Sequence, residues 1–325
     1  MRKIVIFSLC SVLITLCYLT FITAKNVINS DWEMPQEVNI GESKMRIVLI
    51  TQDLETPFWD KVANGAKLQA KENGVSLEVW GSYGNNEEDF LKKIDIAIHS
   101  KVDGIIVQGL DTEEFIDMTK IKAGFYGVPI ITVANDVPMT ESLRKTYVGS
   151  DQYIAGKLIA KQLIRDMGPS GELVLLYDNL QEYYQVERLR GIQETLKNYP
   201  DVTIVHAETP NTREHIITTT QDVLNRVPNA QAFIAVNAKV AGPMVQEISR
   251  RFQVDPLFIY SFDDGPETLS LLTQGKIDAI IEQEPEKMGE ISVEKLLEWL
   301  KGETVPLNID GYFTEINVLK AKDLP

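Results

Sequence analysis

The residues of this chain that could do chemistry recur at one kind of position, the end of a short apolar run. Apolar runs of this length, separated by stretches long enough for a helix, are typical of parallel strands buried on both faces. In open α/β sheets, ligands bind outside the carboxyl ends of the strands. The amides and the carboxylate found there therefore predict groups that converge on a small polar ligand, although each one alone could equally cap a loop or a helix. The runs, each with its polar residue, are Arg46–Ile50 with Gln52, Ile105–Val107 with Gln108, Ile130–Val133 with Asn135, Phe233–Val236 with Asn237, Phe258–Phe262 with Asp263, and Ala279–Ile281 with Gln283.

Two aromatic residues and a threonine follow the first of these runs. Thr56 and Pro57 are of the types preferred at a helix cap and at the first helical position, so a helix is predicted from Phe58 to Lys71. The aromatic face of Phe58 or Trp59 could stack on the C–H face of a sugar ring or form an apolar wall. Alternatively, one of the two belongs to the core at the start of this helix.

Arg188 and Arg190 are interpreted as lying in the first turn of a helix predicted from Tyr183 to Asn198. A cation in that turn is unfavourable against the helix dipole, so a partner must compensate. The partner is either a ligand group in a cleft or, as a structural substitute, Asp263 or a surface carboxylate.

Motifs of catalysis are missing from the sequence. It has no nucleophile elbow, no dinucleotide-binding glycine fingerprint and no phosphate-binding loop. Its three histidines form no metal-ligand spacing with a carboxylate. Asp263 and Asp264 form an acidic pair, but no second acidic pair stands at another strand end. We therefore expect no catalytic residue, no metal site and no cofactor.

Charge and cysteine content narrow the function further. The formal net charge of −15 on 325 residues repels phosphate backbones, so nucleic-acid binding is not expected. Both cysteines, Cys10 and Cys17, lie near the amino terminus, which excludes a disulfide framework and a thiolate nucleophile in the folded part. The length suffices for two domains, because single cores stop growing near ~250–300 residues.

Residues 1–24 are the segment that a globular core does not explain. Arg2 and Lys3 precede an uncharged stretch from Ile4 to Ala24, a pattern that directs the following chain out of the cytoplasm. The stretch is long enough for an uncleaved membrane anchor, and a cleaved signal peptide is the alternative. Residues 25–44 are polar and are interpreted as a stalk.

From Met45 the chain alternates strand and helix in two successive series, each of the size of one doubly wound sheet. Strands left over after both sheets are filled suggest that the chain crosses back, which gives two lobes with a cleft between them. Capping boxes are predicted at Asp111-x-x-Glu114 and Asn211-x-x-Glu214. Further predicted strands are Ser76–Trp80, Glu172–Tyr177 and Thr203–His206, and further predicted helices are Glu87–His99, Tyr153–Met167, Thr212–Asn225 and Pro285–Lys301.

These residues, in this order, resemble the periplasmic binding protein type I family and, within it, the ribose-binding group. The resemblance runs from about Met45 to Lys320. The stretch Thr56-Pro57-Phe58-Trp59 resembles that group's Asn-Pro-Phe-Phe, and Gly104–Gln108 resembles a strand that ends on a ligand asparagine. The residues that match the family's sugar-binding arginine, asparagine, aspartate and glutamine are Arg188, Asn237, Asp263 and Gln283.

The chain departs from the ribose-binding group mainly in the first lobe. Asn135 followed by Asp136 takes the place of an adjacent Asp-Arg pair, and Gln52 stands where a small serine is usual. In the second lobe Asn211 replaces an aromatic wall, although Tyr183-Tyr184 is near enough in sequence to substitute for it. The altered set favours a monosaccharide other than ribose, a sugar derivative or another small polar molecule.

The resemblance implies an α/β fold of two Rossmann-like lobes with parallel sheets, joined by a three-crossover hinge that closes on a ligand. The implied N-terminal lobe comprises residues 45–150 and 284–312, and the implied C-terminal lobe comprises residues 151–283 and 313–325. The implied ligand-binding residues are Gln52, Thr56, Phe58, Trp59, Gln108, Asn135, Asp136, Arg188, Asn211, Asn237, Asp263 and Gln283.

The implied function is extracytoplasmic capture of a small sugar-like solute by a monomer, which delivers it to the permease of an ABC transporter. The alternative is a membrane-anchored receptor that presents its closed form to a sensor histidine kinase without transport. A sugar-responsive repressor with the same core would need a basic DNA-binding segment ahead of Met45, and the apolar segment there argues against it.

Overall fold

The computed structural model describes residues 13–23, 45–83, 86–180, 182–251 and 257–324. The chain divides into two compact units, Met1–Ser43 and Lys44–Pro325. In the first unit, residues 13–23 form a helix with exposed side chains, whereas the rest of the expected targeting segment, 1–24, and the expected stalk, 25–44, lie outside the described residues. None of the described helices has the length and apolarity that a membrane span requires.

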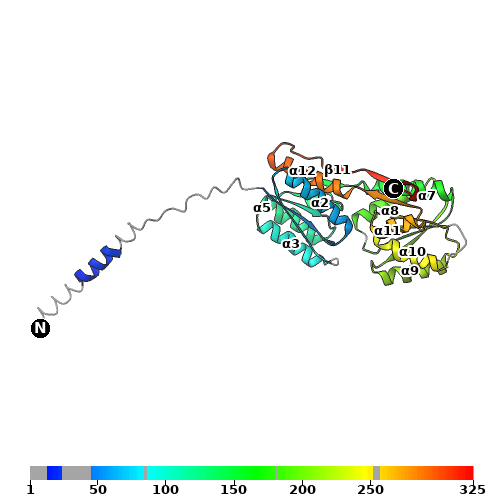
Figure 1. Ribbon diagram of the computed structural model, residues 1–325, viewed down its shortest axis with the longest axis horizontal. Helices are drawn as coiled ribbons and strands as arrows, with labels where there is room; N and C mark the ends of the chain where they lie inside the picture. Colours follow the sequence, from blue (N-terminus) through cyan, green and yellow to red (C-terminus); the bar gives the residue numbers. More distant parts are fainter. Residues whose placement is uncertain (1–12, 24–44, 84–85, 181, 252–256, 325) are drawn as a thin grey trace, which may run out of the picture. The chain divides into compact units, whose positions relative to one another are not determined.

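The first lobe is a six-stranded parallel sheet with helices on both faces (Figure 1). Along its first strand, Ile47 and Leu49 pack among residues of α2 and α12, whereas Val48 and Ile50 pack among residues of α3. The prediction that short apolar runs are strands buried on both faces is therefore confirmed. In the order β11-β5-β4-β3-β1-β2, the strands are β11 (Tyr312–Phe313), β5 (Tyr147–Gly149), β4 (Ile130–Val133), β3 (Gly104–Gln108), β1 (Arg46–Thr51) and β2 (Ser76–Gly81). The helices are α2 (Pro57–Glu72), α3 (Glu87–His99), α4 (Glu113–Asp117), the π-helix η1 (Met118–Ala123), α5 (Gly124–Tyr126), α6 (Met139–Ser142) and α12 (Pro285–Lys301).

The second lobe repeats this plan, with one antiparallel strand, β12, at the sheet edge. One face of its sheet packs against α7 and α8, and the other packs against α9, α10 and α11. In the order β12-β10-β9-β8-β6-β7, the strands are β12 (Ile316–Leu319), β10 (Ala279–Gln283), β9 (Phe258–Phe262), β8 (Ala232–Ala235), β6 (Ser170–Asp178) and β7 (Asp201–Thr209). The helices are α7 (Gln152–Met167), α8 (Tyr183–Leu196), α9 (Arg213–Arg226), α10 (Ala238–Arg251), α11 (Pro266–Thr273) and the 3₁₀ turn η2 (Ala321–Asp323).

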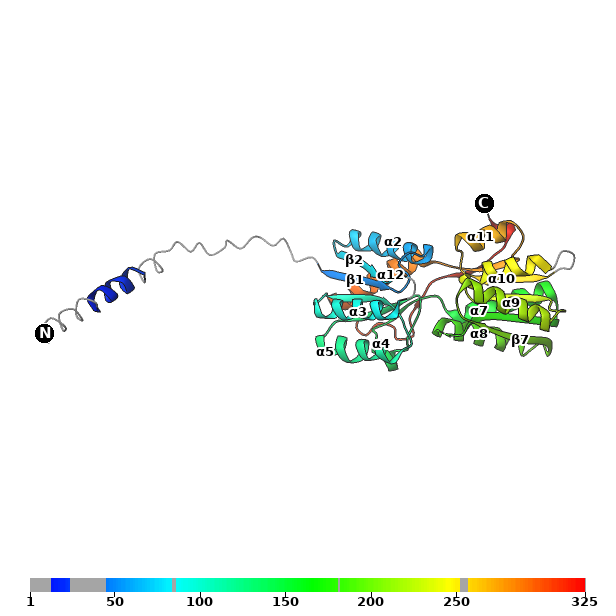
Figure 2. The same cartoon turned by 90° about the horizontal axis from the view of Figure 1, so that it is seen from below.

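The chain passes between the two lobes three times, as Figure 2 shows. The passages lie between β5 and α7, between β10 and α12, and between β11 and β12. Phe313 pairs with Gly149 in the first sheet, so the third passage follows Phe313. In each sheet the strand order reverses beside the first strand, and such a reversal opens a crevice at the carboxyl ends of the strands.

Two of the helices are capped by threonines and not by the predicted capping-box residues. Thr56 caps α2 as predicted, and its hydroxyl accepts a hydrogen bond from the Trp59 amide at 3.4 Å. The capping boxes predicted at Asp111 and Asn211 are wrong, because the next residue occupies the cap in each case. Thr112 and Thr212 have extended backbones directly before α4 and α9, and their hydroxyls accept from the third amide of the helix.

Reciprocal glycines let two pairs of helices approach each other closely, one pair in each lobe. A Cβ added to Gly65 of α2 would lie 1.9 Å from the Glu286 carbonyl oxygen of α12. In the second lobe, a Cβ on Gly156 of α7 would lie 2.1 Å from the Arg188 carbonyl oxygen of α8, and one on Gly191 would lie 2.1 Å from the Tyr153 oxygen. The obstructing atoms are backbone, so they cannot move aside as a flexible side chain would.

We expect Gly156→Ala to lower the free energy of unfolding by about 1–3 kcal/mol, because the added methyl group forces α7 and α8 apart. Urea denaturation measures the change. Gly124→Ala is the matched control, since Gly124 has helical dihedral angles and a Cβ there would meet no atom within 4 Å. Equal stability of the two variants would show that the contact between α7 and α8 tolerates a side chain.

Candidate functional site

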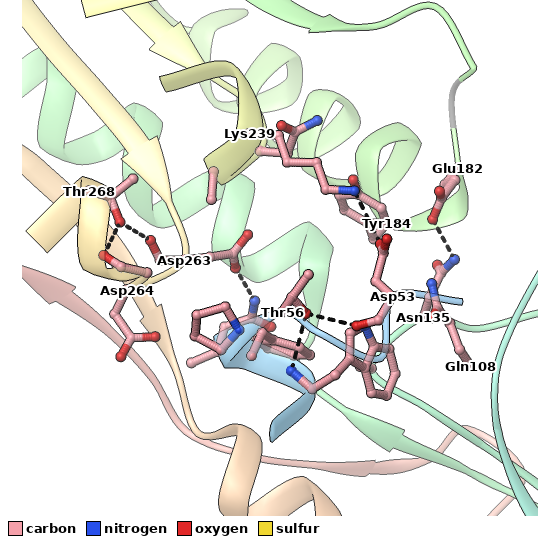
Figure 3. A pocket seen from close by; sticks show the side chains of 18 of the residues that line it. Asp53, Thr56, Gln108, Asn135, Glu182, Tyr184, Lys239, Asp263, Asp264 and Thr268 are labelled. Atoms are coloured by element: carbon pink, nitrogen blue, oxygen red, sulfur yellow. Dashed lines mark hydrogen bonds and ion pairs between the residues drawn. The ribbon is translucent and has the colours of Figure 1, made fainter. Parts of the chain in front are cut away.

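A cavity of about 340 Å³ lies where the carboxyl ends of the two sheets face each other (Figure 3). Both lobes contribute to its wall, and most of the residues predicted from the sequence take part. The predicted residues that line it are Thr56, Phe58, Trp59, Gln108, Asn135, Arg188, Asn211, Asn237, Asp263 and Gln283.

Two buried amide atoms in the cavity wall have no hydrogen-bond partner within the described part of the chain, Asn135 Oδ1 and Asn237 Nδ2. The orientation of each amide is fixed by its other atom. Asn135 Nδ2 donates to the Gly109 carbonyl at 2.8 Å and to Glu182 at 2.9 Å, whereas Asn237 Oδ1 accepts from the Val240 amide at 3.1 Å. An unsatisfied buried polar atom costs about 1–3 kcal/mol. The cavity therefore offers a free acceptor on the first lobe and a free donor on the second.

Asp263 connects several residues of the second-lobe wall through hydrogen bonds. Its backbone is left-handed, with φ of 68°, and its carboxylate accepts from Arg188 at 3.2 and 3.4 Å and from the Gln283 amide. Arg188 also donates to Gln152 and to the Val236 carbonyl, both at 2.8 Å. A fully buried guanidinium is thus paired with a carboxylate and hydrogen-bonded to two further groups.

The structural partner expected for Arg188 is therefore Asp263. The expectation that Arg188 lies in a first helical turn is wrong, because α8 begins at Tyr183 and places it in the second turn. Two aromatic rings flank its guanidinium, that of Tyr184 at 4.9 Å and that of Phe262 at 4.2 Å. Arg190 does not line the cavity; it pairs with Glu187.

Three polar contacts cross the cavity from one lobe to the other, and Figure 3 shows two of them, Lys239–Asp53 and Asn135–Glu182. Lys61 of α2 pairs with Asp264 at 2.6 Å, and Lys239 of α10 pairs with Asp53 at 3.1 Å. The third contact is the bond from Asn135 Nδ2 to Glu182. Ionic and hydrogen-bonded groups of both lobes thus meet across the cavity.

Two carboxyl groups of the cavity wall are harder to ionise than usual. Burial, followed by the negative charge of Asp53, raises the pKa of Glu182 to about 7. Burial also raises the pKa of Asp178, although the hydrogen bond from the Leu180 amide opposes the shift. Both groups are therefore protonated more readily than an exposed carboxyl group.

The two predicted aromatic residues line the cavity in different environments. Trp59 is buried and belongs to the hydrophobic core of the first lobe, which fits the alternative that one of the pair is a core residue. Phe58 is half-buried and packs edge-on against Trp59, with ring centroids 5.5 Å apart. Together they form an apolar surface at the start of α2.

Gln52 and Asp136 do not line the cavity, and the prediction of a ligand contact for them finds no support in their positions. Gln52 is buried, and its side-chain oxygen accepts from Gln108 Nε2 at 3.4 Å. Asp136 forms a buried ion pair with Arg144 at 2.6 Å and accepts from the Thr132 hydroxyl. Ala134 has φ of 64°, a left-handed turn after β4 that leaves Asn135, and not Asp136, in the cavity wall.

Several wall residues were missed by the sequence analysis. Asp178 directly follows the predicted strand Glu172–Tyr177, so the signal that identified the other strand ends could have found it. Glu182 and Lys239 stand at helix starts, and Asp53 follows Gln52 in a loop. No pattern in the sequence distinguishes these three residues from surface charges.

Two doubly wound sheets that present their carboxyl ends to one cavity define a bilobal α/β binding protein. Residues 47–304 match the family model described as periplasmic binding protein domain. The chain belongs to the periplasmic binding protein family and has its type I fold, which confirms the resemblance seen in the sequence.

Individual relatives agree with this assignment. Ribose import binding protein RbsB of Escherichia coli (strain K12) is 23% identical over 264 residues, which cover 81% of this chain and 87% of that protein. The crystal structure of GanP, a glucose-galactose binding protein from Geobacillus stearothermophilus, is also similar, with a TM-score of 0.81 and a sequence identity of 31%. The match covers 87% of this chain and 99% of that one. A chain of the XylFII-LytSN complex is 26% identical, with a TM-score of 0.76 and coverage of 86% and 99%.

The environment of Glu182 can be tested through its effect on stability. Its pKa rises on folding from the usual 4.5 to about 7, so the folded protein holds this proton more tightly than the unfolded chain does. The contribution of Glu182 to stability therefore falls as the pH rises from about 4.5 to about 7 and is constant above that range. The difference in free energy of unfolding between wild type and Glu182→Gln, measured in urea across this range, is expected to follow that course. Glu303→Gln, which changes an exposed carboxylate, is the control; a pH-independent difference for Glu182 would contradict its burial.

Proposed function

We propose that the protein captures a small sugar or sugar-like polyol in the cavity between its lobes. The observation that carries the proposal is the pair of buried, unpartnered atoms Asn135 Oδ1 and Asn237 Nδ2 on opposite walls. A hydroxyl group donates and accepts, so a polyol satisfies both atoms. The names of two relatives, a ribose import binding protein and a glucose-galactose binding protein, support a sugar ligand.

The wall divides into polar and apolar parts that suit a sugar ring. A cavity of about 340 Å³ is within the usual size of small-molecule sites, roughly 300–1,000 Å³. Asp263 would accept hydrogen bonds from ligand hydroxyls, and Gln283 would donate to them. Arg188 would hold the Asp263 carboxylate in place. Phe58 and Trp59 would pack on the C–H face of the ring.

Ligand binding would favour the closed arrangement of the lobes. The pairs Lys61–Asp264 and Lys239–Asp53 and the Asn135–Glu182 bond all join the two lobes across the ligand space. The three passages of the chain would then act as the hinge, with lobes close to the ranges expected from the sequence, except that Phe313 belongs to the first lobe. Closure excludes water and strengthens each polar contact to the ligand.

In this proposal the protein works outside the cytoplasm and delivers its ligand to the permease of an ABC transporter. Residues 1–24 would serve as signal peptide or anchor. The second candidate function is presentation of the closed form to a membrane sensor kinase, and the observation that favours it is the XylFII-LytSN complex, in which a similar chain was solved with a second protein.

Cells that lack the protein separate these two candidates. Loss of uptake of the radiolabelled ligand supports transport. Unchanged uptake together with loss of the transcriptional response to that ligand supports sensing.

Asp263→Ala is expected to weaken ligand binding by at least ~2 kcal/mol, because ligand hydroxyls lose a charged acceptor. Isothermal titration calorimetry against a panel of pentoses, hexoses and non-sugar osmolytes measures the affinity. Asp263→Asn is the second variant. It retains the shape of the side chain, whereas Asp263→Ala leaves Arg188 buried without its partner. Asp222→Ala, on the exposed side of α9, is the control. Unchanged affinity in both Asp263 variants would remove this residue from the site. Failure of every sugar and polyol to bind, aminated forms included, would refute the proposed function.

A further inference from the structure

The charges of the cavity wall are unevenly matched between its two ends. Its cations are Lys61, Arg188 and Lys239, and each is already paired with a carboxylate. Asp178 and Glu182 also line the cavity, and neither forms an ion pair within the described residues. Among the described residues, the wall therefore contains two carboxyl groups that are not paired with a cation of their own.

These unmatched groups lie at one end of the cavity. In Figure 3, Glu182, Asn135 and Asp53 lie together on the side away from Asp264 and Thr268. The charged groups that face Glu182 are Asp53, Asp178 and Lys239, and Lys239 is already 3.1 Å from Asp53. Three carboxyl groups thus share one ammonium group at what we call the acidic end, defined by Asp53, Asp178 and Glu182.

A second observation concerns the hydrogen bonds at this end of the cavity. Asn135 uses both hydrogens of its amide, one toward the Gly109 carbonyl and one toward Glu182. Its oxygen, on the same planar group, is buried and has no donor in the described part of the chain. An acceptor without a donor therefore adjoins a carboxylate without a cation.

Because of this arrangement, we infer that the ligand is an aminated sugar or polyol whose ammonium group occupies the acidic end of the cavity. The inference rests on the proposed function and makes its ligand class more specific. An ammonium group carries three donors and a positive charge, so it can reach Asn135 Oδ1 and Glu182 at once. A neutral hydroxyl has one hydrogen to donate and leaves the charge unmatched. The raised pKa of Glu182 agrees with this, because burial and the neighbouring charge of Asp53 disfavour a carboxylate that has no cation of its own.

Calorimetry of the full-length protein with matched sugars tests the inference. The ligands are glucose and galactose, their 2-amino and 2-acetamido forms, and the 3-amino and 6-amino forms of glucose. At least one free amine is expected to bind about tenfold or more tightly than its neutral parent, as a charge-assisted hydrogen bond contributes more than a neutral one. Where an acetamido form is included, it should lose this advantage, because it retains the nitrogen without the charge.

Two variants connect the preference to Glu182. Glu182→Gln is expected to reduce the ratio of amine to neutral affinity to near one, and Glu303→Gln, which removes an equal charge from an exposed site, is expected to leave it unchanged. Near pH 7, the wild type should release more protons on binding the amine than Glu182→Gln does, because the ammonium lowers the pKa of Glu182. Calorimetry in buffers of different ionisation enthalpy measures this difference.

The remaining outcomes separate the inference from the proposed function. Neutral sugars that bind as tightly as their amines would overturn the inference and leave sugar binding intact. An amine preference that survives Glu182→Gln would overturn the assignment of the ammonium to the acidic end. If neither neutral nor aminated sugars bind, the proposed function fails, and the inference fails with it.

Discussion

The second-lobe wall of the cavity depends on the buried cation of Arg188. Its side chain is 2% exposed, and burying a guanidinium is costly unless it is paired and hydrogen-bonded. Its partners come from separate elements, Gln152 from α7, Val236 after β8 and Asp263 after β9. Asp263 in turn accepts from Gln283 at the end of β10. The second-lobe wall is thus assembled around the requirement to neutralise one charge.

The polar groups that are left unsatisfied lie on opposite lobes. In the second lobe, the groups around Arg188 largely satisfy one another, and the Asn237 amide remains open. In the first lobe, the Asn135 amide donates to Gly109 and to Glu182 of the second lobe, and its oxygen has no hydrogen-bond partner among the described residues. In the proposed function, a ligand that reaches both atoms gains full benefit only while the lobes are together, so recognition and closure would depend on the same two contacts.

The sequence was sufficient to predict the strands of both sheets but not to predict every residue of the cavity wall. Strands buried on both faces produce continuous apolar runs, which is why β1, β3 and β9 could be predicted closely. The side chain that enters the cavity wall after a strand depends on local backbone angles, and the left-handed turn at Ala134 explains why Asn135 lines the cavity and Asp136 does not. Glu182 is part of the wall because of contacts across the cavity, and such contacts leave no local pattern. The observed helix caps, Thr112 and Thr212, each lie one residue after the predicted caps, Asp111 and Asn211.

The reciprocal glycines of α2 with α12 and of α7 with α8 have a mechanical consequence. Backbones in direct contact cannot slide past each other without a steric clash, so each helix pair resists internal shear. Two of these helices, α7 and α12, begin immediately after passages between the lobes. In the proposed closure each lobe would therefore turn as a stiff lever, and a displacement of ångström size at the ligand would reappear, enlarged, at the outer rim where a membrane partner could detect it.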